Sequence, residues 1–197
     1  IVYSGATKGW IPLDDDDTAF EPVAPPTQRA LFGYGATSGG KISITNLVSS
    51  SGVVAADVTG VGTARGDLAA AGYGSDKAIF GYGRTGSNLS MTNLVNNSGV
   101  VAADTTGVGT ARWGLGAANY GSDKAIFGYG TTGSNSSLTN LVSNSGVVAT
   151  DTTGVGTARY YTAGVSYGED KAIFGYGYNG GNLSLTNLVS NLGVVSA

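Results

Sequence analysis

The chain has 197 residues, of which 34 are glycine and only 12% are charged, and it contains neither cysteine nor histidine. The absence of these two residue types excludes disulfide bonds, zinc sites built on Cys or His, thiol nucleophiles and the Ser–His–Asp triad. The net charge of −3 and the isoelectric point near 4.7 argue against nucleic acid as a partner, and no apolar run is long enough to insert into a membrane.

The first 28 residues differ from the rest of the chain in charge. They contain one lysine and five acidic residues, four of them in the run Asp14–Asp17, whereas residues 29–197 carry nine basic and eight acidic residues. The segment Glu21–Pro26 is rich in proline, which is typical of a stiff, extended linker. The acidic run lacks the spacing of a calcium-binding loop, so we expect no metal there. These features predict an acidic N-terminal arm over residues 1–28 and a separate domain over residues 29–197.

The second part of the chain is an internal repeat with a period of 47 or 48 residues. The phrase Arg-Ala-Leu-Phe-Gly-Tyr-Gly, which begins at Arg29, returns with small changes at Lys77, Lys124 and Lys171. Two further phrases, Thr-Asn-Leu-Val and Gly-Val-Gly-Thr-Ala-Arg, keep the same spacing wherever they occur. The sequence therefore divides into copies over residues 29–76, 77–123 and 124–170, and a partial copy over residues 171–197.

Each full copy predicts four short β-strands. In the second copy we expect strands over residues 77–82, 89–95, 100–105 and 113–120, separated by turns rich in Gly, Asn and Ser. A glycine or a β-branched residue interrupts every ten-residue window, which argues against helix. The fold is therefore predicted to be all-β. Four short strands in a unit of this length match one blade of a β-propeller.

Two aromatic residues recur once per copy, in the phrase Phe-Gly-Tyr-Gly. We expect the phenylalanines to be buried at equivalent positions in successive sheets; they are Phe32, Phe80, Phe127 and Phe174. For the tyrosines, the sequence favours packing between sheets, because the flanking glycines let backbones approach closely. The alternative is a ring of exposed aromatics that stack on sugars. These tyrosines are Tyr34, Tyr82, Tyr129 and Tyr176.

An acidic and a basic residue also recur, eight positions apart. The aspartates are Asp57, Asp104 and Asp151, and the arginines are Arg65, Arg112 and Arg159. A strand and a Gly-rich return predict that each aspartate lies close to the arginine of its own copy. The favoured interpretation is a structural ion pair or loop cap; the alternative is a ring of catalytic or metal-binding carboxylates. Catalysis is disfavoured, because a catalytic pair needs two different environments to separate its pKa values.

One asparagine in each copy lies in an otherwise apolar strand. These residues are Asn46, Asn93, Asn140 and Asn187. A side-chain amide can satisfy backbone groups within the sheet, which is the favoured interpretation, and the alternative is that these residues line a channel.

A further set of aromatics varies between the copies. Gly66, Trp113 and Tyr160 occupy equivalent loop positions. Variation on a fixed scaffold is a common way for a fold to acquire a binding site, and a flat ring stacks on a sugar face without needing charge. We therefore predict ligand binding at Trp113, Tyr160, Tyr161 and Tyr178, with incidental surface aromatics as the alternative.

The order of these segments resembles the kelch repeat, a propeller blade of about fifty residues. The resemblance rests on Ile79–Gly83, Leu89–Val95, Val100–Arg112 and Trp113–Lys124, which follow one another as the parts of a kelch blade do. Two features depart from that family: Gly-Tyr-Gly replaces an adjacent glycine pair, and the usual tryptophan before the loop is missing. The resemblance implies a propeller of four-stranded blades, in which the N-terminal arm could complete a blade. An open β-repeat array along a fibre is the alternative.

Residues 2–12 resemble short modules in tail-fibre and other virion appendage proteins of marine bacteriophages. This resemblance implies a virion surface location and other virion or fibre chains as partners, in a homo-oligomer or larger assembly. With the repeated and catalytically bare sequence, it predicts a non-enzymatic, adhesive module that binds cell-surface glycans and needs no cofactor. The alternatives are an extracellular fibril or surface-layer subunit of a cell and, less favoured, a glycan-active propeller enzyme.

Overall fold

The described part of the chain contains only β-strands, turns and loops. The computed structural model describes residues 2–3, 10–11 and 30–196. Over these residues the all-β prediction is confirmed, and no helix is present that could cross a membrane. Within the predicted arm, β1 (Val2–Tyr3) pairs antiparallel with β2 (Trp10–Ile11), and the rest of the arm lies outside the described residues.

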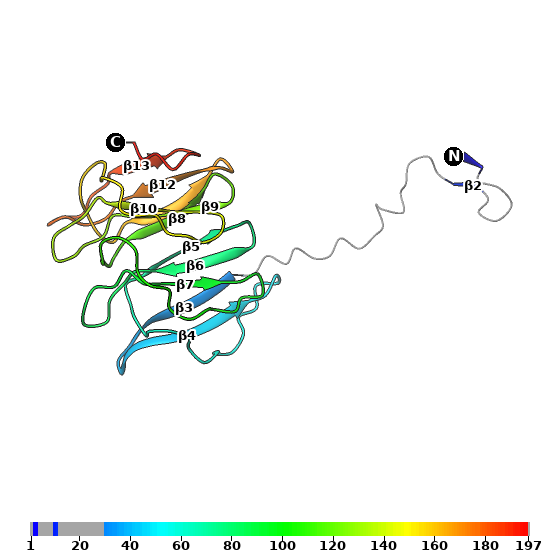
Figure 1. The fold of residues 1–197 in the computed structure, drawn as a ribbon, viewed down its shortest axis with the longest axis horizontal. Helices are drawn as coiled ribbons and strands as arrows, with labels where there is room; N and C mark the ends of the chain where they lie inside the picture. The colour runs from blue at the N-terminus through cyan, green and yellow to red at the C-terminus, as the bar shows by residue number, and fades with distance from the viewer. Residues whose placement is uncertain (1, 4–9, 12–29, 197) are drawn as a thin grey trace.

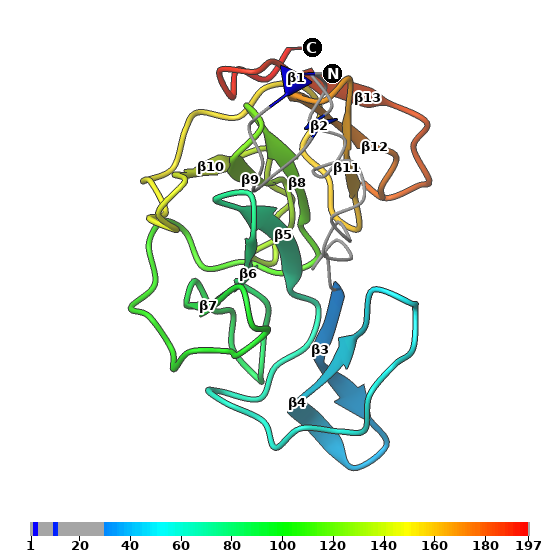
Figure 2. The same cartoon turned by 90° about the vertical axis from the view of Figure 1, so that its right-hand side faces the viewer.

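Residues 30–196 form four small antiparallel sheets, none of which closes into a barrel. The first sheet pairs β3 (Ala30–Thr37) with β4 (Gly40–Val48). The other three sheets each have three strands: β5 (Ala69–Tyr73), β6 (Lys77–Gly81) and β7 (Thr92–Val95); β8 (Gly116–Tyr120), β9 (Lys124–Gly128) and β10 (Thr139–Val142); β11 (Ala163–Tyr167), β12 (Lys171–Gly175) and β13 (Thr186–Val189). The sheets follow one another in chain order, from β3–β4 at one end to β11–β13 at the other (Figures 1 and 2).

The prediction of four regular strands per unit is wrong. The segment predicted as a strand over residues 100–105 makes only two isolated bridges, Val95↔Val101 and Thr92↔Thr105. The reason lies in Asn93, whose side-chain amide donates to the Ala102 carbonyl at 2.9 Å and to the Asp104 carboxylate at 2.9 Å. The side-chain amide of Asn93 thus binds to the segment that lies between the two bridges. These contacts confirm the structural role expected for the asparagine.

Each three-stranded sheet combines the end of one sequence copy with the start of the next. For example, β8 pairs in full register with β9, from Gly116↔Gly128 to Tyr120↔Lys124. The first strands of successive sheets, β5, β8 and β11, also pack against one another. Each of the three full copies therefore contributes to two sheets, which ties neighbouring copies together through the backbone.

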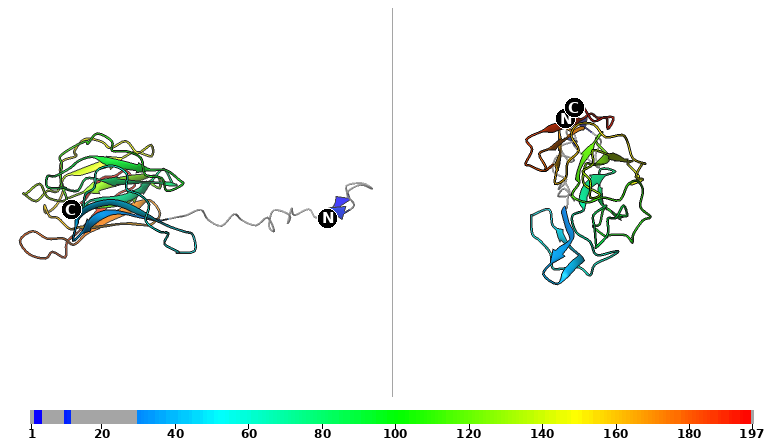
Figure 3. Two further views of the ribbon diagram at one scale, coloured as in Figure 1. Left: turned by 90° about the horizontal axis from the view of Figure 1, so that it is seen from below. Right: turned by 90° about the vertical axis from the view of Figure 1, so that its left-hand side faces the viewer.

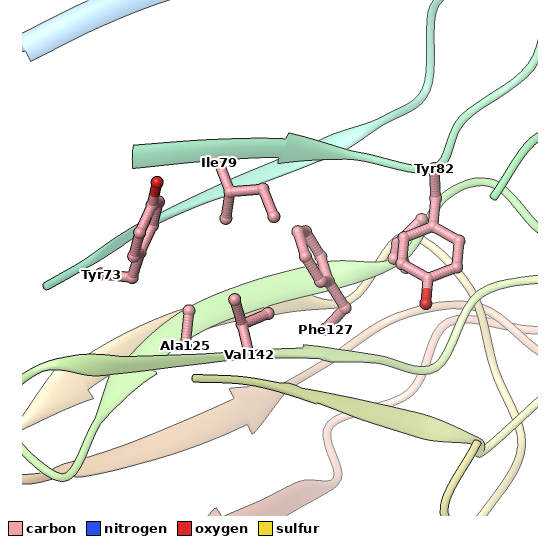
Figure 4. Close-up of a cluster of buried hydrophobic side chains, with 7 residues drawn as sticks. Tyr73, Ile79, Tyr82, Ala125, Phe127 and Val142 are labelled. Carbon is pink, nitrogen blue, oxygen red and sulfur yellow. The ribbon is translucent and has the colours of Figure 1, made fainter. Parts of the chain in front are cut away.

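The phenylalanines fill the space between successive sheets by lying over glycines. A Cβ atom on Gly81 would lie 2.6 Å from Cζ of Phe127, and one on Gly128 would lie 2.8 Å from Cζ of Phe174. Phe127 reaches from β9 toward β6, near Ile79 and Tyr82 (Figure 4). Phe80, Phe127 and Phe174 are buried as predicted. Glycine is needed at these strand positions because any side chain would occupy the volume of the ring.

The repeated tyrosines pack edge-on against the phenylalanine of the next sheet. The ring centres lie 5.1 Å apart for Tyr34 and Phe80, and 5.2 Å apart for Tyr82 and Phe127. Tyr129 and Phe174 repeat the arrangement at 5.3 Å. Packing between sheets, the favoured interpretation, is confirmed for Tyr34, Tyr82 and Tyr129, which are all buried.

The two ends of the array break the pattern. Phe32 was predicted to be buried but is 64% exposed, because no sheet of the described residues packs on the outer face of β3–β4 as the later sheets pack on one another. At the other end Tyr176 is also 64% exposed, because no described sheet follows β13. The described residues therefore form an open array with two free end faces, and Figure 3 (left) views it from the side on which β3 and β4 lie.

Candidate functional site

One backbone position carries a different side chain in each copy. Short antiparallel bridges join Gly66 to Arg84, Trp113 to Thr131, and Tyr160 to Tyr178. These bridges use backbone atoms alone; for example, Trp113 N donates to Thr131 O at 3.1 Å and Thr131 N donates to Trp113 O at 2.9 Å. The scaffold is therefore the same at each bridge, whereas the surface that it presents changes from polar to aromatic along the array.

The four aromatics predicted to bind a ligand come together in space. The Trp113 ring centre lies 5.4 Å from that of Tyr160 and 5.7 Å from that of Tyr161. Tyr160 in turn lies 4.7 Å from Tyr161 and 5.6 Å from Tyr178. Most of these rings meet edge to face, an arrangement that aromatic quadrupoles favour. They form one continuous group, called here the aromatic cluster: Trp113, Tyr160, Tyr161 and Tyr178.

A backbone ladder places Tyr161 beside Trp113. Gly114 N donates to Asp67 O at 2.8 Å, and Tyr161 N donates to Gly114 O at 2.6 Å. All three residues of this ladder have positive φ, 55° at Asp67, 64° at Gly114 and 54° at Tyr161. A side chain at Gly114 would meet the Tyr160 and Tyr161 rings at 3.4 Å. Glycine at this position therefore suits the left-handed backbone and leaves room for both rings.

The aromatic cluster borders an open hollow of about 560 Å³. Tyr161 is 56% exposed and Tyr178 is 38% exposed, so both rings present apolar surface to solvent. The hollow is lined by Tyr160, Tyr161, Tyr176, Gly177, Tyr178, Asn182 and Leu183. Tyr176, predicted to be structural, thus belongs to this site because it lies at the end of the array. Among the described residues no charged side chain lines the hollow, and the tyrosine hydroxyls and the Asn182 amide supply its polar side-chain groups.

A charged group covers Trp113. The Arg84 guanidinium carbon lies 3.6 Å from the centre of the Trp113 ring, and Arg84 Nε donates to Asp67 at 2.8 Å. Lys41 Nζ lies 3.7 Å from the same carboxylate. Arg84 therefore holds the Trp113 ring in place by a cation–π contact. The Trp113 ring in turn packs against Tyr160 and Tyr161. The sequence prediction missed this residue, although position 84 also varies between the copies.

The aspartates and arginines pair across copies, not within them as predicted. Arg65 Nη1 lies 3.9 Å from Asp104, and Arg112 Nη1 lies 3.8 Å from Asp151. The same carboxylates accept bonds from the preceding copy, with Thr110 Oγ1 donating to Asp151 at 2.6 Å. The Gly-rich loop is long enough to reach the next sheet, so each arginine joins its own copy to the following one.

Arg112 lies completely buried in one of these junctions. Its Nε donates to Tyr129 O at 2.8 Å, and its Nη2 donates to Asn140 Oδ1 at 2.7 Å. Its guanidinium carbon also lies 4.4 Å from the centre of the Tyr82 ring. Burial lowers the pKa of Arg112, and the same lack of solvent raises the pKa of Tyr82 to about 12. The junction is a structural network of polar groups within an apolar interface.

The carboxylates at two of these junctions have matching environments. Although burial acts to raise it, bonds from Thr63 and Asn93 and the nearby Arg65 hold the pKa of Asp104 below its usual value. Asp151 is held the same way by the equivalent residues of the next copy, and its pKa is lowered too. Two carboxylates that both stay ionised near neutral pH do not provide the acid and base that hydrolysis of a glycosidic bond needs. Over the described residues, no group of three or more acidic side chains is placed to hold a metal ion.

The sequence matches no protein-family model and no curated protein. Within the described residues, the aromatic cluster and the uncharged hollow beside it are the features that point to a ligand.

Proposed function

We propose that this chain is a non-enzymatic, adhesive module of a phage virion fibre or appendage, which binds glycans on a cell surface through the aromatic cluster. In this proposal the sheets are kelch-like blades, and other virion or fibre chains carry the module at the virion surface. The viral context comes from the resemblance of residues 2–12 to virion appendage modules. The proposal that the ligand is a glycan is based on the chemistry of the residues that line the hollow.

The observation that carries the proposal is the group of exposed tyrosines around an uncharged hollow. A pyranose ring has apolar C–H faces and polar edges, so it suits a site of flat rings with a few hydroxyl and amide groups. Tyr161 and Tyr178 offer rings to solvent, and Asn182 lies on the same rim. Trp113, whose ring lies against the Arg84 guanidinium, supports Tyr161 from the side.

A double substitution tests the proposal. Tyr161→Ala with Tyr178→Ala removes the two exposed rings, and we expect it to abolish binding to an array of cell-surface oligosaccharides. Both side chains are partly exposed, so the melting temperature should change little. The matched control is Leu192→Ser, which removes an exposed apolar side chain outside the hollow and installs the serine that occupies this position in the other copies.

Two results would refute the proposal. One is undiminished array binding by the double variant, because the aromatic cluster would then have no part in recognition. The other is release of reducing sugar from a polysaccharide that is lost in Asp104→Asn or Asp151→Asn. Such turnover would show that the repeated carboxylates act in catalysis and not only in structure.

A further inference from the structure

The contact between successive sheets occurs three times within the array, and each end face of the array carries the residues of one of its two sides. On the first side, a phenylalanine projects; on the second, a glycine leaves room for it. Inside the array, Cζ of Phe80 lies 3.0 Å from where a Cβ on Gly33 would be, and the corresponding distances for Gly81 and Gly128 are 2.6 and 2.8 Å. At the ends, within the part of the chain that the structure describes, Phe32 projects without a glycine beneath it, and Gly175 has no ring above it.

The tyrosine that follows this glycine shows the same loss of a neighbour. Tyr34, Tyr82 and Tyr129 are buried by the next phenylalanine, whereas Tyr176 is 64% exposed. Near Gly175, the nearest atom outside its chain neighbours is Cγ2 of Thr186, in the same sheet, at 3.7 Å from a built Cβ. The space above Gly175 in the last sheet is thus open, whereas Phe174 fills the equivalent space above Gly128 one repeat earlier.

A second contact, between a turn glycine and a leucine, recurs at the junctions between copies. Each end face of the array carries one of its two partners. Inside the array a turn glycine of one copy packs on a leucine of the copy before it, as Gly99 does on Leu47 and Gly193 does on Leu141. At the ends, Gly52 has no atom within 4 Å of a built Cβ, and Leu188 is 48% exposed. In two separate places, therefore, a group on the first sheet and a group on the last sheet each lack the partner that the other would supply. These pairs are Phe32 with Gly175 and Gly52 with Leu188.

We propose that two copies of this chain bind head to tail, with the β3–β4 face of one copy seated on the β11–β13 face of the other. Phe32 of one copy lies over Gly175 of the other and against its Tyr176, and Gly52 lies on Leu188. The occupant is a second copy because each face complements the other in residue type and placement. The faces lie at opposite ends of the molecule, so one chain does not bring them together (Figures 1 and 2).

This interface has a predictable chemistry and symmetry. The proposed contacts between copies, Phe32 with Gly175 and Tyr176 and Gly52 with Leu188, join uncharged residues. Association through these contacts should therefore be insensitive to salt, since none of them is an ion pair. A head-to-tail contact leaves one free face at each end, so copies add in a row or close into a ring of several copies.

Because the chain contains no cysteine, single thiols can report which faces meet. We expect the full chain to show concentration-dependent association by sedimentation velocity. A mixture of the Phe32→Cys and Gly175→Cys variants should form a cross-linked dimer under mild oxidation, and neither variant should cross-link alone. Phe32→Ser and Gly175→Leu should each weaken association at least tenfold, with the circular dichroism spectrum unchanged.

Tyr176 borders both the hollow and the end face, so it is left unaltered. Tyr161→Ala is the control, because Tyr161 takes no part in the contacts proposed between copies; it should lose glycan binding and keep association. Phe32→Ser should do the reverse, so failure of the proposed function and failure of this inference give different results. A chain that remains monomeric at its highest soluble concentration would overturn the inference. Cross-linking of Phe32→Cys to itself would also overturn it, because that result shows that two β3–β4 faces pair with each other. Association that begins only when residues 1–28 are deleted would overturn it too, because that result shows that the chain's own arm covers Phe32.

Discussion

Replacing Arg112 is the most direct test of how the array holds together. Its side chain is fully buried and makes bonds to three acceptors from two copies: Tyr129 O, Thr110 O at 3.1 Å and Asn140 Oδ1. It serves better than Arg65, whose Nη2 is buried without a hydrogen-bond partner. Arg112→Ala removes all of these bonds and the cation–π contact with Tyr82 at once.

The expected cost follows from these contacts. A hydrogen bond to a charged group contributes about 1.5–3 kcal/mol, and a desolvated cation–π contact about 2 kcal/mol. These contributions overlap, and removing one side of a buried charged network costs roughly 3–5 kcal/mol, which we expect for Arg112→Ala. Arg112→Lys keeps the charge but loses the planar fork, and should cost about 2 kcal/mol.

Equilibrium urea unfolding measures these losses through the midpoint and slope of the transition. Arg84→Ala is the control, since Arg84 also stacks on an aromatic ring and bonds a carboxylate but is partly exposed, with 37% of its side chain accessible. We expect the control to cost about 1 kcal/mol or less. If Arg112→Ala costs no more than Arg84→Ala, the buried arginine does not stabilise the junction between copies and the reasoning is wrong.

Two further substitutions probe the interior. Phe127→Ala should lower the free energy of unfolding by roughly 3–5 kcal/mol, whereas Phe32→Ala, at the exposed equivalent position, should change that of the monomer by less than about 0.5 kcal/mol; equal losses would contradict the stacking. Tyr82 has a pKa raised from 10.0 to about 12 by burial, so between these pH values the unfolded chain has lost a proton that the folded chain keeps. Stability should fall over this range by up to about 2.7 kcal/mol, and urea titrations of Tyr82→Phe should show a shallower fall than the unaltered chain.

The sequence predicts the units of this fold well, because each unit depends on local chemistry. Alternating apolar residues, glycine-rich turns and the 47-residue period correctly indicate short antiparallel strands and the absence of helix from the described residues. The strand expected over residues 100–105 fails because Asn93 bonds to it through its side chain. The asparagine is visible in the sequence, but its choice of acceptor depends on a neighbouring segment in space.

Partners between copies are harder to predict, since a repeat offers every residue several identical partners. Arg65 lies eight positions from Asp57 and 39 positions from Asp104, and sequence spacing favours the nearer one. The structure pairs it with the farther one because the Gly-rich loop leaves its own sheet for the next. Burial of Phe32 fails for the same reason: the phrase around it is the same as in the other copies, and only the missing neighbour distinguishes it.

Comparison of the copies with one another separates scaffold from site. The arginine and asparagine at the junctions are the same in each full copy, and at two successive junctions they make the same bond, from Arg112 to Asn140 and from Arg159 to Asn187. At the bridge positions the contacts come from the backbone, so the side chains there can differ without loss of a bond. Differences gather at these positions and produce the aromatic cluster from residues of the second, third and fourth copies, where the scaffold tolerates change and the rings reach solvent. A binding surface can therefore be altered by substitution at the bridge positions, while the junction residues keep the sheets in place.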